Sequence, residues 1–397
     1  MAVEVAIVAD DLTGALDVAG PFAARGQRTV VAVDERACAP GRFGAADVVS
    51  INATSRHLPA ARAAALVEDV VARLCPAGAP ILIKKIDSTL RGNVAAETLA
   101  MLKASGRRCA IVAPAFPAQG RTMIDAMVHV RGEPLPATPF ARDALSPPPL
   151  APLDAVFRAA APEARVARVA ADGRIDTGGG DGGLVVLVVD STTDADLEHC
   201  VRGLQGRLHE CVLVGSAGIA AAVARVCMPP APPRGQPRLA GDILIAVGSR
   251  AEQSAAQVAT LAGQPGVTLF SAPNGRVDGA AMLADDAPIQ VLKATPDAQG
   301  REGDAEAVAR SLAAGVVERV RARQVDALLA TGGDTAIAIL HALSCAMLEV
   351  MGDLVPGIPY SRLEVEGRPL LLLTKAGGFG TADTLVQVVR RLRRGPE

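Results

Sequence analysis

One local pattern recurs along the 397 residues: a short apolar run ends in a turn that carries Gly or Asp, and an Ala-rich helical stretch follows. This alternation is typical of parallel β-sheets, in which each strand is followed by a returning helix. In the first half the apolar runs cover residues 3–9, 28–33, 47–51, 80–83, 109–113, 184–189 and 211–214. In the second half they cover residues 242–247, 267–270, 289–293, 327–330 and 369–373. The pattern predicts an α/β protein with two doubly wound domains and mainly parallel sheets.

A proline-rich segment separates the two halves. Residues 227–241 read CMPPAPPRGQPRLAG, and prolines at this density exclude a helix or a central strand. A chain of this length also exceeds what one hydrophobic core usually serves. We therefore predict an N-terminal domain at 1–228, a linker at 229–241 and a C-terminal domain at 242–397. Residues 145–152, rich in proline, and 177–183, rich in glycine, are predicted to be loops inside the first domain, because strand patterns resume after each.

Charge and composition exclude several kinds of partner. The formal net charge is −2 and the arginines are scattered among acidic residues, so we expect no nucleic-acid partner. No apolar run reaches the roughly 18 to 20 residues that span a bilayer, and the N-terminus lacks the basic segment of a signal peptide. The seven cysteines are widely spread without a C-x-x-C pair, which fits buried thiols in a reducing cytosol. We expect a cytoplasmic protein without a membrane partner, and a homo-oligomer is compatible with this composition.

The common nucleotide-binding signatures are missing from the sequence. No Gly-Lys dipeptide occurs, which excludes a Walker A loop, and neither D-F-G nor H-R-D is present. One G-x-G-x-x-G match, at Gly178, Gly180 and Gly183, precedes an apolar run, whereas a dinucleotide-binding fold needs it to follow a strand. We interpret this match as a loop.

Two adjacent carboxylates, Asp10 and Asp11, stand where the first apolar run ends, and Thr13 and Gly14 then open a helix. Ligands of open α/β sheets bind at this edge. The pair could accept hydrogen bonds from a polyol, hold a metal ion or take the proton of an attacking hydroxyl. The alternative is that Asp11 or Thr13 only caps the helix. We predict a catalytic role for Asp10 and Asp11.

A second polar cluster follows the apolar run at 80–83 and combines cations with a carboxylate and a hydroxyl. Its members are Lys84, Lys85, Asp87, Ser88 and Arg91. The chain has only five lysines, so two adjacent ones suggest that a compact ammonium is needed there. Lys and Arg together form a natural clamp for a carboxylate, although a solvated surface turn is the alternative. Two further arginines, Arg56 and Arg121, lie in loops after other apolar runs.

Three junctions in the second half place small residues between an apolar run and a helix. They contain Gly248 and Ser249; Gly332, Gly333, Asp334 and Thr335; and Lys375, Gly377 and Gly378. Glycines there let backbone N–H groups approach a phosphate, and the helix N-terminus adds a favourable dipole. A structural turn also needs glycine, but three such loops with a lysine predict a cradle for a triphosphate. The five histidines show no pairing, which disfavours a metal site or a histidine base.

The segments DDLTGA, KKIDSTLRGN, APAFPAQGRT, TGGDTA and KAGGFG occur in this order over nearly the whole chain, and together they resemble the four-carbon acid sugar kinase family. The resemblance implies a sugar-acid-binding N-terminal domain, a nucleotide-binding C-terminal domain and a ligand cleft between them. It also implies transfer of phosphate from ATP, with Mg²⁺, to the terminal C4 hydroxyl of a tetronate. By position, Asp10, Asp11, Arg56 and the cluster at 84–91 would contact the sugar acid. Ser249, Gly332 to Thr335 and Gly377 would contact ATP.

The pair GGDTA and KAGGFG is similar to the threonate or erythronate kinase branch, whereas oxo-tetronate kinases more often resemble GGETSG with KSGNFG. D-threonate is therefore the expected substrate, and D-erythronate, an oxo-tetronate and glycerate are alternatives. The chain departs from the family after Thr122, where it reads MIDAMVHV without the glycine commonly found there. Two other classes of protein are disfavoured. An NAD-dependent sugar-acid oxidoreductase would need a G-x-G-x-x-G motif after a strand, and this sequence has none in that place. A two-domain binding protein would typically carry an export signal.

Overall fold

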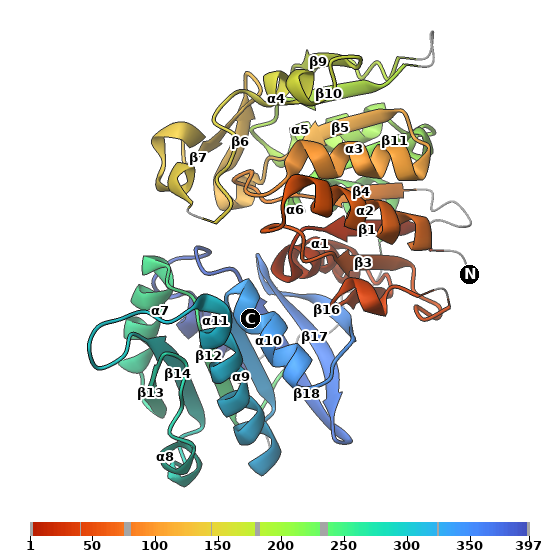
Figure 1. Ribbon diagram of the computed structural model, residues 1–397. Coiled ribbons are helices and arrows are strands. Elements are labelled where there is room, and N and C mark those ends of the chain that lie inside the picture. The colour runs from red at the N-terminus through yellow and green to blue at the C-terminus, as the bar shows by residue number, and fades with distance from the viewer. Residues whose placement is uncertain are drawn as a thin grey trace. The chain divides into compact units, whose positions relative to one another are not determined.

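The computed structural model describes residues 3–39, 41–74, 81–143, 145–178, 183–230, 237–323 and 325–394. The chain divides into two compact units, Met1–Pro232 and Pro233–Glu397, and each combines a sheet with helices (Figure 1). Residues 231–236 of the expected linker lie outside the described residues, as do residues 179–182 of the expected Gly-rich loop and Pro80 at the start of one expected strand.

The N-terminal unit alternates short strands with helices. In chain order its elements are β1 Val5–Ala9, α1 Leu12–Ala24, β2 Thr29–Ala32, β3 Val48–Asn52, α2 Ala60–Leu74, β4 Ile81–Lys85, α3 Val94–Ser105, β5 Cys109–Ala113, β6 Arg121–Ile124, β7 Met127–Val130, β8 Glu133–Pro134, α4 Leu153–Ala160, β9 Arg165–Val169, β10 Val185–Val189, α5 Asp194–Gly203, β11 Cys211–Gly215 and α6 Ala217–Cys227.

Eight of these strands form a parallel sheet in the order β2-β3-β1-β4-β11-β5-β10-β9. Every residue of β1, β3, β4, β5, β10 and β11 is buried, as expected for a parallel sheet that helices cover on both faces. Strands β6, β7 and β8 form a separate antiparallel sheet.

The strand order places a topological switch point beside β1. Helix α1 leads from β1 toward β2, and α2 leads from β3 back across β1 to β4, so right-handed crossovers put these helices on opposite faces. Helix α2 packs against α3, whereas α1 packs against α6. The neighbouring strands β1 and β4 are therefore followed by helices on opposite faces, and ligands bind where this happens.

The C-terminal unit follows the same plan. Its elements are β12 Ile243–Val247, α7 Glu252–Ala262, β13 Val267–Pro273, α8 Gly279–Ala284, β14 Ile289–Thr295, α9 Ala305–Ala322, β15 Ala327–Thr331, α10 Gly333–Ala342, β16 Met347–Val355, β17 Ile358–Val365, β18 Arg368–Lys375 and α11 Thr384–Arg394.

Strands β13, β14, β12, β15 and β18 are neighbours in this order and run parallel, and β17 and β16 extend the sheet in an antiparallel meander. Helix α7 leads from β12 toward β13, and α9 leads from β14 across β12 to β15, which makes β12 and β15 the switch point of this unit. Figure 1 shows α9 and α10 side by side, and they pack against each other.

The expected fold class, α/β with mainly parallel sheets in two domains, is confirmed, and each expected apolar run overlaps a strand of the main sheets. Strands β6 to β9, β16 and β17 were not anticipated. The helices in the described part of the chain are all too short or too polar to cross a membrane.

Candidate functional site

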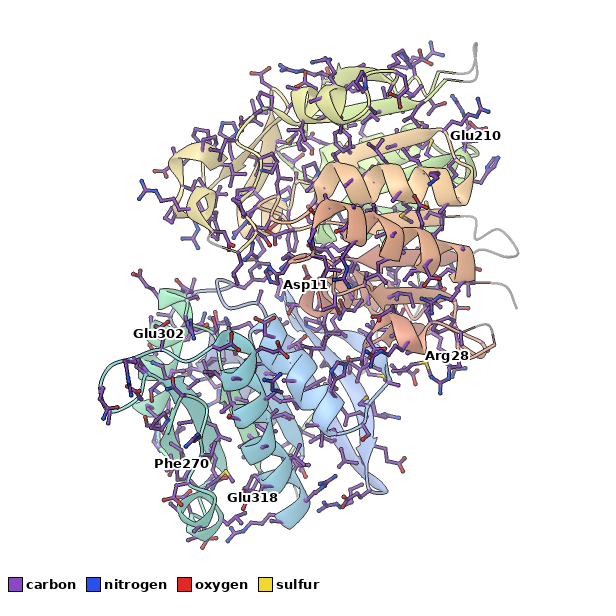
Figure 2. All side chains as sticks on the ribbon, in the orientation of Figure 1. Asp11, Arg28, Glu210, Phe270, Glu302 and Glu318 are labelled. Carbon is purple, nitrogen blue, oxygen red and sulfur yellow. The ribbon has the colours of Figure 1, made fainter. Side chains whose placement is uncertain are left out.

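The first candidate site begins at the carboxyl end of β1, where Asp10 and Asp11 lie. Asp11 is the N-cap of α1, and its Oδ1 accepts a hydrogen bond from the backbone N–H of Gly14 at 2.9 Å. Figure 2 labels Asp11 at this edge of the N-terminal unit. Asp10, one residue earlier, is buried, with 3% of its surface exposed. The cap expected as an alternative therefore exists, but it accounts for Asp11 alone.

Arg56, in the loop after β3, binds both carboxylates. Its Nε donates to Asp10 Oδ2 at 2.7 Å and its Nη1 donates to Asp11 Oδ2 at 2.9 Å. Its Nη2 lies 2.8 Å from Asp11 Oδ1 and 3.8 Å from Asp87 Oδ1. Burial alone would raise the pKa of Asp10, but the positive charges of Arg56 and Lys85 outweigh burial and lower this pKa. Asp10 is therefore held as a carboxylate.

The loop after β4 adds a second ion pair, which is partly buried. Arg91 Nε and Nη2 donate to the two carboxylate oxygens of Asp87 at 2.8 and 3.1 Å. Burial opposes the charge of Asp87, yet Arg91 and Arg56 hold its pKa well below the usual range. The hydroxyl and the N–H of Thr89 also donate to Asp87, and Ser88 beside it is buried. The expected clamp residue Arg91 is thus already neutralised on one side.

The adjacent lysines of β4 point to opposite faces of the sheet, because successive side chains of a strand alternate. Lys85 Nζ lies 3.8 Å from Asp10 Oδ1 and against Gly14 of α1, where an added Cβ would be 2.3 Å away. Lys84 is fully buried and pairs with Glu97 of α3, with 2.8 Å between Nζ and Oε2. The structure brings Lys85, but not Lys84, to the carboxylates of the site.

Two buried polar atoms of this site have no hydrogen-bond partner among the described residues: Asp10 Oδ1 and Thr13 Oγ1. Buried polar groups are nearly always satisfied, so each such atom calls for a ligand or a bound water. A carboxylate oxygen accepts hydrogen bonds and a threonine hydroxyl both donates and accepts. With the ammonium of Lys85 beside them, these atoms suit a ligand that carries hydroxyl groups and negative charge.

The Pro-rich segment expected to be a loop is attached to this site, which the sequence did not indicate. Asp143 Oδ2 lies 3.5 Å from Arg91 Nη1, while its Oδ1 accepts the N–H groups of Leu145 and Ser146. Ser146 Oγ donates to the backbone carbonyl of Arg56 at 3.0 Å. No local sequence signal marks these contacts, because they depend on residues about 50 and 90 positions apart.

The other expected arginine, Arg121, is buried at the start of β6, and its guanidinium lies 5.8 Å from the centre of the Phe140 ring. Burial lowers its pKa, and the charge of Asp87 opposes this shift. Asp17 of α1 is a further buried carboxyl group near the site that the sequence did not single out. Burial raises its pKa to about 6, against the opposing charge of Lys85.

The second candidate site lies in the C-terminal unit, where the three expected glycine junctions follow β12, β15 and β18. They pack tightly against one another. An added Cβ on Gly377 would lie 2.0 Å from Ser249 Oγ, and one on Gly248 would lie 2.0 Å from Thr335 Oγ1. Gly332 has a φ of 103° and donates its N–H to the carbonyl of Lys375 at 3.0 Å. The three junctions therefore form one cluster at the carboxyl edge of the sheet.

This cluster presents unpaired backbone donors. Gly333 is the first residue of α10, and Asp334 and Thr335 follow in its first turn, where helical N–H groups lack an intrahelical acceptor. A Cβ added to Gly378 would meet nothing within 4 Å, so the space beside this residue is open. N–H groups at a helix start beside open glycine turns suit a phosphate.

No group of three or more His, Cys, Asp or Glu residues that could hold a metal ion occurs in the described segments of the chain. Mg²⁺ is commonly bound through one or two carboxylates together with substrate phosphates and water, and it needs no cage of protein ligands. Asp334 is an exposed carboxylate at the glycine cluster. These residues fit a magnesium ion that arrives with a nucleotide.

Comparison with known proteins agrees with this division of ligand sites. A family model described as a sugar-binding N-terminal domain matches residues 5–223, and one described as a nucleotide-binding C-terminal domain matches residues 244–385. A D-threonate kinase from Bordetella bronchiseptica is 34% identical over 98% of this chain and 97% of that protein. A 3-oxo-tetronate kinase from Methylobacterium radiotolerans is 28% identical over 96% of this chain and 98% of that protein.

A solved structure from Salmonella typhimurium LT2 has the same fold, with a TM-score of 0.77 at 20% identity over 98% of this chain and 99% of that chain. The two domain models together account for nearly the whole sequence, and the Bordetella relative matches it almost from end to end. The resemblance inferred from the five motifs is thereby confirmed: the chain belongs to the four-carbon acid sugar kinase family.

Proposed function

We propose that this protein transfers phosphate from ATP to the terminal C4 hydroxyl of a four-carbon sugar acid, and that D-threonate is its substrate. The observation that carries the proposal is the 34% identity over nearly the full length to a D-threonate kinase. It is supported by the two candidate sites at the carboxyl edges of the sheets: the site of the N-terminal unit is polar and buried, and that of the C-terminal unit is rich in glycine. The cytoplasm, which supplies ATP, is the compartment we propose for the reaction.

In the N-terminal unit, Asp10 is the residue that we assign to the reacting hydroxyl. Both oxygens of Asp11 are occupied by Arg56, and one of them also caps α1. Asp10 Oδ1 has no hydrogen-bond partner among the residues described. A carboxylate with a lowered pKa is a weak base, so its main contribution is to accept the hydroxyl hydrogen bond and orient the oxygen. Positioning of this kind supplies much of the catalysis in phosphoryl transfer.

The carboxylate of the sugar acid requires a cation. We assign the binding of this carboxylate to Lys85 and to Arg91 Nη1, for which Asp143 Oδ2 competes at 3.5 Å. Ser88 lies in the same loop as Arg91. Arg56 would not contact the sugar acid itself but would hold Asp10 and Asp11 in place. In the C-terminal unit, Ser249, the first turn of α10 and the loop 376–380 would hold the phosphates. Mg²⁺ bound with those phosphates would neutralise part of their charge.

The proposal is tested by measuring ADP formation with ATP and Mg²⁺ and a panel of acids: D-threonate, D-erythronate, a 3-oxo-tetronate and glycerate. We expect the highest kcat/KM with D-threonate. The 28% identity to a 3-oxo-tetronate kinase makes that acid the second candidate. A higher kcat/KM with any other acid would overturn the choice of substrate, and no turnover with any tetronate would overturn the kinase assignment.

Two neighbouring variants test the assignment of Asp10. We expect Asp10→Asn to reduce kcat at least a hundredfold with a smaller effect on the KM for ATP. Asp11→Asn keeps one oxygen that can accept the Gly14 N–H, so we expect a smaller loss of kcat from this variant. Equal kcat values in Asp10→Asn and wild type would remove Asp10 from the mechanism.

A further inference from the structure

The ammonium of Lys375 lies behind the glycine loop that follows β18, and its donors are turned into the loop. Nζ donates to the backbone carbonyls of Ala376 at 2.8 Å, Gly377 at 3.2 Å and Phe379 at 3.2 Å. The side chain is buried, with 1% of the residue exposed. We propose that Lys375 is a positioning residue, which shapes the loop 376–380 into a seat of backbone N–H groups for a nucleotide phosphate. This inference rests on the proposed kinase function and deepens it.

The direction of the N–H groups follows from the geometry of the peptide bond. In a trans peptide the C=O of one residue and the N–H of the next point in opposite directions within one plane. Carbonyls 376, 377 and 379 point toward Lys375 Nζ, so the N–H groups of Gly377, Gly378 and Gly380 point away from it. One ammonium thus sets the direction of three backbone N–H groups that could donate hydrogen bonds to a phosphate.

Helix α7 reinforces this arrangement from its N-terminal turns. Ser254 Oγ donates to the carbonyl of Gly377 at 2.9 Å, and Gln253 Nε2 donates to that of Gly380 at 2.8 Å. Gln257 Nε2 donates to the carbonyls of Phe379 and Thr381 at 2.8 and 3.0 Å. Four of the five carbonyls of the loop 376–380, those of Ala376, Gly377, Phe379 and Gly380, therefore accept hydrogen bonds from within the protein.

The donor side of the loop is open. Within the described residues, the backbone N–H groups of Gly377, Gly378 and Gly380 donate to no protein acceptor, whereas that of Phe379 donates to Ala376. The absence of any atom within 4 Å of a Cβ built on Gly378 leaves room for a ligand there. Successive free N–H groups in a turn form an anion-binding concavity, the kind of nest that holds phosphate in other folds.

The charge of Lys375 adds to this geometry. Its ammonium forms no ion pair within the described parts of the chain, and burial lowers its pKa to about 8. A buried cation without a counter-ion is destabilising, and an anion bound across the thin loop would offset part of that cost. Lys375 would thus attract the phosphate without touching it, in contrast to a lysine that projects into the ligand.

Lys375→Met keeps the length of the side chain but removes the donors and the charge. We expect it to raise the KM for ATP at least tenfold and to leave the KM for the sugar acid within twofold of wild type. Lys103→Met is the matched control, because it removes the same charge from an exposed lysine of the N-terminal unit. A KM for ATP within twofold of wild type in Lys375→Met would overturn the inference, as would an equal increase in both KM values.

A measurement on the wild-type protein tests the same idea without relying on the folding of a variant. In protein labelled with ¹⁵N-glycine, addition of ADP and Mg²⁺ should shift the amide resonances of Gly377, Gly378 and Gly380. Unchanged resonances at saturating ADP would refute the phosphate seat. Because ADP binding needs no sugar acid, this result stands apart from the kinase assignment, which would fail instead by absence of turnover with every tetronate.

Discussion

The buried ion pair between Lys84 and Glu97 allows the role of Lys84 to be tested through stability. The two side chains are 0% and 1% exposed and join β4 to α3 across 2.8 Å. Lys84→Met would leave the carboxylate of Glu97 buried without its cation, and removing one partner of such a pair typically destabilises a protein by about 3–5 kcal/mol. Replacing both residues, as Lys84→Met with Glu97→Leu, is often neutral or stabilising. The double variant should therefore recover most of the stability that the single variant loses.

Scanning calorimetry of the full chain measures this effect. For a unit of 150–250 residues, each 1 kcal/mol shifts Tm by roughly 2–4 °C, so the transition of the N-terminal unit in Lys84→Met should fall by roughly 6–20 °C. The double variant should lie within a few degrees of wild type and keep its KM for the sugar acid. A double variant as unstable as the single one would refute the electrostatic reasoning. A stable double variant with a strongly raised KM for the acid would instead make Lys84 a substrate ligand, as the sequence suggested.

Three further changes have defined outcomes. Asp143→Asn should lower the KM for the sugar acid by up to about fivefold at unchanged kcat, because a partly exposed carboxylate no longer competes for Arg91; an unchanged or raised KM would contradict this. Gly377→Ala should lower Tm and raise the KM for ATP, since its Cβ would lie 2.0 Å from a serine hydroxyl. Gly378→Ala should keep the Tm of wild type, and equal Tm values for the two variants would refute the packing argument. Asp17 has a pKa raised to about 6, so its folded form binds more protons than the unfolded chain between pH 4 and 6 and stability falls as pH rises through that window. Asp17→Asn should remove this part of the pH dependence in urea titrations at pH 4, 5, 6 and 7, and identical profiles would refute it.

The strands of the two main sheets could be predicted because parallel strands buried on both faces read as continuous apolar runs. Strand β10, Val185–Val189, is a clear example, with all five residues buried. Strand β16 lacks a continuous apolar run because its residues alternate: Leu348, Val350, Gly352 and Leu354 are buried, while the positions between them are partly exposed. Strand β17 begins with four buried residues and alternates only from Arg362 to Val365. A search for a period of two would have found β16. Strand β8, Glu133–Pro134, is too short for any pattern.

The location of the polar site was predictable for a topological reason. Asp10, Arg56 and Lys85 each follow or end an apolar run, and the carboxyl ends of parallel strands lie at one edge of the sheet. The pairing inside the site was not predictable, because it depends on which strands are neighbours. Arg56 contacts both adjacent aspartates since β3 and β4 flank β1 on either side.

The same pairing changes how the site must recognise an anion. The sequence suggested a cationic cluster, but three aspartates, Asp10, Asp11 and Asp87, accompany the three cations Arg56, Lys85 and Arg91. Their formal charges cancel, so a negatively charged sugar acid gains little from the net field of these six residues. Its binding must depend on local, directional contacts: the donors that Lys85 and Arg91 retain, and the unpaired acceptor of Asp10. Hydrogen bonds placed in this way discriminate among hydroxyl positions more sharply than a positive surface would, because an acid that lacks the matching hydroxyl leaves a buried carboxylate oxygen unsatisfied.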